Sequence, residues 1–131
     1  REKNVRMTLN FGHTFAHGFE GAKNFSKKLN HGEAVLLGMM MANKLAVKKK
    51  ILSLREFEVI NQHYADLNLL RDFKKKFKTK DINKIVHFVK KDKKNFNEKI
   101  NLIFIKKIGL VTRPGKYKVN VNDFKKFLIS Q

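Results

Sequence analysis

The spacing of apolar residues predicts a helical start to this chain. Between residues 6 and 24, apolar side chains recur at intervals of three and four, which forms one stripe along an α-helix. At about 100° per residue, a narrow polar arc falls on the opposite face. The stripe consists of Phe11, Phe15, Phe19 and Ala22, and the arc of Arg6, Asn10, His13, His17 and Glu20.

A second helix is predicted over residues 31–48. Asn30 suits its N-cap, and Glu33 three residues later completes a capping-box pattern. The residues after Glu33 are almost all apolar, so no polar face remains over the first turns and we expect burial on all sides. We interpret the methionine run at 39–41 as core packing rather than as a set of ligands.

Two more helices are predicted, over residues 54–69 and from Asp81 onward, with Asp81 as the cap of the latter. His63 flanks the apolar face of the first and His87 lies opposite that of the second, so both are interpreted as ordinary surface or structural residues. The apolar faces consist of Phe57, Ile60, Tyr64 and Leu67, and of Ile82, Ile85, Val86 and Val89.

Near the C-terminus the apolar period changes to two. Residues 100–105 and 117–121 alternate around an Arg-Pro-Gly-Lys turn, which predicts a small β-hairpin. A final short helix is expected to be capped by Asn122 or Asp123. The fold class is therefore mainly α, with at most a small β-hairpin, in one domain that covers residues 1–131.

The net charge of +19, from 30 Lys and Arg against 11 Asp and Glu, raises the question of nucleic-acid or membrane binding. The charge is spread along the chain and comes mostly from lysine, whereas base readout and bidentate phosphate contacts favour arginine. Lys, Asn, Ile and Phe also share A/T-rich codons, and an anionic substrate fits the charge equally well. A non-catalytic basic module stays as an alternative, which predicts salt-sensitive nucleic-acid binding.

Cysteine is absent, so a metal would have to be held by His, Asp or Glu, and the composition fits a reducing compartment. The longest apolar stretch, residues 34–42, is too short to span a bilayer, and no signal-peptide pattern is present. We expect a cytoplasmic protein without membrane association. Because the chain starts at Arg1, we also expect it to be a piece of a longer protein.

Three histidines could form a metal site. His13 and His17 are four residues apart on one helical face, where their rings can converge on one ion or substrate. His31 starts the second helix, where the helix dipole disfavours imidazolium and leaves the neutral ring that binds metals. Such a set suits Zn²⁺, Co²⁺ or Fe²⁺, with Glu20 and Glu33 as nearby carboxylates. On spacing alone, ordinary surface histidines are an equally good interpretation.

The residues themselves are more specific than their spacing. LNFGHTFAHGFE at 9–20, followed by HGEAV at 31–35, resembles the C-terminal signature of the 3-dehydroquinate synthases, LN-x-GHT-x-GHA-x-E followed by HGEAV. Asp92-Lys93-Lys94 and the strand at 105–109 resemble later family motifs. Ala16 and Gly18 exchange small residues relative to the signature, and Phe19 replaces a smaller apolar residue.

The resemblance implies a multi-helical domain of the dehydroquinate-synthase-like fold and a lyase activity. The family converts 3-deoxy-D-arabino-heptulosonate 7-phosphate to 3-dehydroquinate and phosphate. This is a step of the shikimate pathway toward chorismate and aromatic amino acids, and it uses NAD and a divalent metal, usually zinc. The family is usually homodimeric, and its NAD-binding domain precedes this one. The fragment alone is therefore expected to be inactive.

The resemblance also assigns roles to single residues. His13 and His31 match metal ligands (Zn or Co), and His17 matches a histidine near the substrate phosphate with a proton-transfer or anchoring role. The family's third ligand, a glutamate, lies in the preceding domain, so Glu20 and Glu33 are interpreted as helix-structural. The residues matched to substrate binding are Arg6, Asn10 and Lys93, with Lys94 as the competitor of Lys93.

Two related activities stay open. Other sugar-phosphate cyclases, making inosose or valiolone products, and metal-dependent alcohol dehydrogenases such as glycerol dehydrogenase also use helical domains with paired histidines. The match over residues 9–35 favours 3-dehydroquinate synthase over the dehydrogenases, and it separates the cyclases less well.

Overall fold

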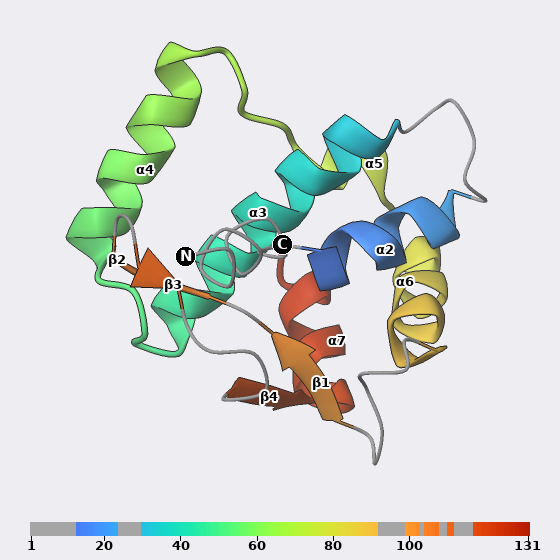
Figure 1. Ribbon diagram of the computed structural model, residues 1–131. Helices are drawn as coiled ribbons and strands as arrows, with labels where there is room; N and C mark the ends of the chain where they lie inside the picture. Colours follow the sequence, from blue (N-terminus) through green and yellow to red (C-terminus); the bar gives the residue numbers. More distant parts are fainter. Residues whose placement is uncertain (1–12, 24–29, 92–98, 103, 108–109, 112–116) are drawn as a thin grey trace, which may run out of the picture.

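A computed structural model describes residues 13–23, 30–91, 99–102, 104–107, 110–111 and 117–131 (Figure 1). The mainly α fold is confirmed. A second two-stranded sheet accompanies the expected hairpin. The helices are α2 (His13–Ala22), α3 (His31–Lys48), α4 (Leu54–Asp66), α5 (Phe73–Lys76), α6 (Thr79–Lys91) and α7 (Val121–Ile129), and the strands are β1 (Lys99–Leu102), β2 (Ile105–Lys107), β3 (Leu110–Val111) and β4 (Tyr117–Asn120).

Helix α2 lies between α3 and α6 and carries the centre of the core (Figure 1). Phe15 and Phe19 are completely buried, as their stripe predicted. Phe15 stacks on Phe124 of α7 with ring centroids 5.0 Å apart, and Phe19 lies 5.1 Å from Phe77, which follows α5. These aromatic contacts fix α2 against elements from the middle and the end of the chain.

Helix α3 has the predicted bounds, and its caps explain them. The Asn30 side chain accepts a hydrogen bond from the Glu33 backbone N–H at 2.8 Å, as an N-cap does. At the other end Lys50 adopts a left-handed conformation with φ of 61°, and the Ile51 N–H donates to the Ala46 carbonyl at 2.9 Å. This is the Schellman arrangement that ends a helix. Met40 and Met41 are buried in the core, as expected.

Three helix ends differ from the sequence prediction. Helix α4 stops at Asp66, not 69, because Asn68 takes the left-handed conformation (φ 58°), and Leu67 is therefore 55% exposed instead of buried. Asp81 is not the cap of α6 but its third residue, and its carboxylate accepts from the Lys78 N–H at 2.9 Å. Helix α7 is capped by Asn120, two residues before the expected Asn122, because the chain passes directly from β4 into the helix.

The predicted hairpin is confirmed in the pairing of β1 with β4, which places Ile100 opposite Val119. Ile100, Leu102 and Phe104 are all buried, so the alternation identified the inner face correctly. The strand predicted over residues 100–105 is divided, because β2 begins at Ile105 and pairs with β3 instead of β4. The turn at 113–116 lies outside the described residues.

Helix α4 lies at the surface, and none of its residues is buried. It contacts α3 through half-buried side chains, among them Tyr64. Burial raises the pKa of the Tyr64 hydroxyl above its ordinary value, while the neighbouring Asn43 amide acts in the opposite direction. Asn43 is completely buried, yet among the described residues its amide makes no well-aligned hydrogen bond.

Candidate functional site

The candidate site lies where α2 runs toward the start of α3. His13 is the first residue of α2, and His17 follows one turn later with an exposed side chain. His31 is the first residue of α3, and its side chain is 71% exposed. The backbone thus places these three predicted residues on two helices that pack against each other.

Glu20 joins the two helices at this point. Its carboxylate oxygens lie 3.2 and 3.3 Å from Nδ1 of His31, so both oxygens are within hydrogen-bond distance of the same ring nitrogen. When the Nδ1–H donates to this carboxylate, the neutral ring carries its lone pair on Nε2. A carboxylate that fixes the tautomer and orientation of a histidine in this way is the usual partner of a metal-bound imidazole.

Glu33 has the structural role that the sequence indicated. Its carboxylate accepts from the Asn30 side-chain amide at 3.3 Å, and it lies 3.5 Å from the ammonium of Lys76 on α5. Both contacts tie the first turn of α3 in place. Glu20, in contrast, contacts a side chain of the next helix, which a purely helix-structural role does not explain. The contact depends on how α2 packs against α3, which the sequence pattern alone does not specify.

Two glycines of α2 allow this helix to pack closely against α6. A Cβ added at Gly18 would lie 2.6 Å from Cγ2 of Val89 on α6, and one added at Gly21 would overlap the Phe88 ring. Only glycine allows the α2 backbone to approach α6 this closely. Gly18, a departure from the family signature, therefore has a packing reason in this chain. The close approach determines where the polar face of α2, with His17 and Glu20, comes to lie.

Several predicted site residues lie outside the described residues: Arg6, Asn10, Lys93 and Lys94. The side chain of His13 is also not described, so its role as a ligand stays a prediction. Within the described ranges no group of three or more His, Cys, Asp or Glu side chains is arranged to hold a metal. His63 and His87 are exposed, as expected, and the His87 ring packs edge-on against Phe88 at 5.5 Å.

Helices long and apolar enough to cross a bilayer do not occur in the portion of the chain that the structure describes.

Comparison with known proteins shows one family to which the chain is similar in sequence. Residues 1–95 match the family described as 3-dehydroquinate synthase C-terminal. The chain is 48% identical to the 3-dehydroquinate synthase of Pelagibacter ubique (strain HTCC1062) over 123 residues, which cover 94% of this chain and 32% of that protein. It is 41% identical to the enzyme of Helicobacter pylori (strain HPAG1) over 111 residues, which cover 83% and 30% of the two chains.

A likeness of fold extends to the solved structure of a different synthase. The structure of 2-deoxy-scyllo-inosose synthase complexed with carbaglucose-6-phosphate, NAD⁺ and Co²⁺ superposes with a TM-score of 0.73 at 20% identity, covering 91% of this chain and 33% of that one. The chain thus spans about a third of the length of the relatives that it matches.

Proposed function

Because this chain belongs to the 3-dehydroquinate synthase family through its C-terminal domain, we propose that it forms the metal- and substrate-binding part of a 3-dehydroquinate synthase. The complete enzyme would convert 3-deoxy-D-arabino-heptulosonate 7-phosphate to 3-dehydroquinate and phosphate. NAD would be bound mainly by an N-terminal domain corresponding to the two thirds of the relatives that this chain does not span. The chain alone would then lack turnover, and its activity would depend on that domain.

The contact between Glu20 and His31 carries the proposal. In it, His31 would bind the metal through Nε2, and His13 would be the second ligand from this chain. Glu20 would not be a ligand, because both its oxygens face Nδ1 at 3.2 and 3.3 Å. Its negative charge would instead make the imidazole a better donor and hold its plane. Two neutral imidazoles and a carboxylate from another domain fit Zn²⁺ or Co²⁺.

The bound metal would polarise the substrate alcohol and the ketone that it becomes. His17, one turn after His13 on the exposed face of α2, would hold the substrate phosphate or move a proton beside it. The predicted contacts of Arg6 and Asn10 with the carboxylate and hydroxyls of the substrate complete this assignment, together with Lys93. The strong positive charge of the chain fits a substrate with a carboxylate and a phosphate.

A second candidate is another sugar-phosphate cyclase reaction, and the fold shared with 2-deoxy-scyllo-inosose synthase supports it. The higher identity to 3-dehydroquinate synthases favours the first candidate. A metal-dependent alcohol dehydrogenase has no comparable support, and neither has a nucleic-acid-binding module.

A chimera tests the proposal. This chain would replace the last third of the Pelagibacter ubique enzyme, and phosphate release from 3-deoxy-D-arabino-heptulosonate 7-phosphate would be measured with NAD and Zn²⁺ or Co²⁺. We expect turnover by the chimera, loss of at least about a hundredfold in His31→Ala, and little change in His87→Ala. Turnover of a hexose 6-phosphate instead would favour the second candidate. A folded chimera that is inactive with both substrates would contradict the proposal.

A further inference from the structure

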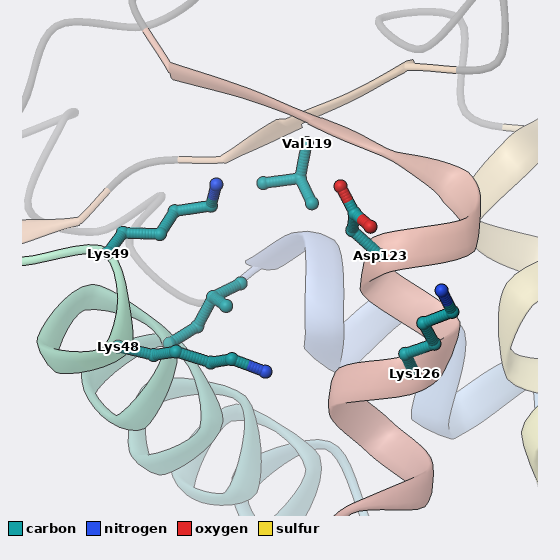
Figure 2. A pocket seen from close by; sticks show the side chains of 6 residues that line it. Lys48, Lys49, Val119, Asp123 and Lys126 are labelled. Carbon is teal, nitrogen blue, oxygen red and sulfur yellow. The ribbon is translucent and has the colours of Figure 1, made fainter.

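A pocket of about 280 Å³ opens at the opposite end of α3 from His31 (Figure 2). Its walls come from three elements that are distant in sequence: the last turn of α3, strand β4 and helix α7. Lys48 lies seventeen residues after His31, which corresponds to roughly 25 Å along the helix axis. The lining residues are Leu45, Lys48, Lys49, Val119, Asp123 and Lys126.

The pocket combines an apolar base with a charged rim. Leu45 and Val119 are 3% and 1% exposed, so they belong to the core and form the base. Lys48, Lys49 and Lys126 are exposed. Figure 2 shows Lys48, the last residue of α3, and Lys49, which follows it, on one side of the pocket, and Asp123 and Lys126 of α7 on the other. Three ammonium groups and one carboxylate give the rim a net charge of +2.

The position of these lysines at a helix end is not by itself informative. The α3 dipole favours cations such as Lys48 at its C-terminus, whatever they bind. Lys126 likewise lies in the last turn of its helix α7, whose dipole favours it for the same reason. Neither dipole explains why ammonium groups from two separate helices line one hollow, where a bound anion would relieve their mutual repulsion. In the described part of the chain, no ion pair neutralises Lys48, Lys49 or Lys126, since the three ion pairs found there involve other residues.

We propose that this pocket binds a small organic phosphate dianion, with the phosphate between the ammonium groups of Lys48, Lys49 and Lys126 and the body of the ligand on Leu45 and Val119. The net charge of the rim matches a phosphate monoester. The volume lies just below the roughly 300–1,000 Å³ of typical ligand pockets, which suits a ligand with a single ring. Asp123 would weaken phosphate binding by its like charge.

The ligand would join α3 to β4 and α7. These elements come from the middle and the end of the chain, so an occupant bound to the native state alone would raise its thermal stability. The inference is independent of the proposed function, because none of the residues that line the pocket belongs to the candidate metal site.

The test uses phenyl phosphate and inorganic phosphate as probes on the 131-residue chain at about 0.15 M salt, where exposed charges are screened. Binding would be followed by NMR shifts of the Leu45 and Val119 methyl groups and by the melting temperature. We expect saturable binding of both probes, tighter for phenyl phosphate because its ring covers the apolar base. The double variant Lys48→Ala/Lys126→Ala should bind at least about tenfold more weakly, and Asp123→Asn more tightly.

The matched control is Lys44→Ala/Lys125→Ala, which removes the same charge from the same two helices outside the pocket. This control should bind like the unmodified chain. Equal weakening in both double variants would overturn the proposal, because it would indicate general attraction to a basic protein. Methyl shifts that never saturate, or equal affinity for the two probes, would overturn it as well. Near-identical NMR spectra of the free proteins would show that every variant is folded.

Discussion

Glu20 on α2 and His31 at the start of α3 hold a carboxylate and an imidazole Nδ1 3.2 Å apart, across eleven positions in the sequence. This contact joins the two motifs that carry the family resemblance, GHT-x-x-H-x-x-E at residues 12–20 and HGEAV at residues 31–35. The Glu20 carboxylate therefore has a defined partner on the next helix, in addition to its place in α2. A neutral His31 ring is therefore expected to carry its proton on Nδ1.

The tautomer of His31 is the first prediction. Long-range ¹H–¹⁵N NMR couplings should show Nδ1 protonated in the neutral ring of the unmodified chain. Glu20→Gln keeps an acceptor oxygen and should preserve this tautomer. Glu20→Ala removes the acceptor and should shift the ring toward protonation on Nε2. The same tautomer in all three proteins would show that Glu20 does not orient His31.

Because α2 packs so closely on α6, adding one methyl group at either glycine of the contact is expected to destabilise the fold. Gly18→Ala and Gly21→Ala should each lower the free energy of unfolding by about 1–3 kcal/mol, because the added Cβ overlaps Val89 or Phe88. Gly32→Ala is the matched control, since a Cβ there meets only Asn30 Oδ1, at 3.4 Å. That variant should be unchanged or slightly more stable. Urea unfolding would measure all three, and equal effects would refute close packing as the cause.

Substitutions at Asn30, the N-cap of α3, are expected to change the free energy of unfolding by a smaller amount than those at the two glycines. Asn30→Ala removes the acceptor of the Glu33 N–H, which lies 2.8 Å away, and should cost about 1 kcal/mol of unfolding free energy. Asn30→Asp retains an acceptor at the positive end of the helix dipole and should restore most of the loss. If both variants unfold at the same denaturant concentration as the original chain, the cap does not contribute to stability.

The raised pKa of Tyr64 leads us to expect a loss of stability in alkaline solution. Burial raises its pKa in the folded protein above the unfolded value of 10.0, so the folded state binds its proton more tightly. The associated stability is complete below pH 10 and is lost as the pH rises above the unfolded pKa. Tyr64→Phe should show a weaker decline of unfolding free energy above pH 10 than the original chain. Parallel declines would mean that lysine deprotonation alone is responsible.

The elements that the sequence predicted best have strong local determinants. The Asn30 cap fixed the start of α3, and the phenylalanine stripe identified the buried face of α2. The errors arose where similar residues compete. Asn120, Asn122 and Asp123 are all good caps, and only the passage from β4 selects the first. The end of α4 depended on Asn68, one of several residues able to adopt a left-handed conformation.

The candidate site was predictable in its residue types and not in its contacts. Helical spacing placed His13 and His17 one turn apart, but the sequence has no signal for the distance between Glu20 and His31, because that distance depends on how α2 packs on its neighbours. The pocket between Lys48 and Lys126 could not be predicted from the sequence either, because the chain has 30 basic residues and nothing in the sequence sets these lysines apart. Tertiary packing alone distinguishes these lysines from the others.

Calorimetric titration of the chain with Zn²⁺ and Co²⁺ near neutral pH would show whether His13 and His31 are metal ligands. We expect weak binding at one site per chain, weakened at least about tenfold in His31→Ala and in His13→Ala and retained in His87→Ala. Equal metal binding in all four proteins would contradict this assignment, because the histidines of α2 and α3 would then not form a site.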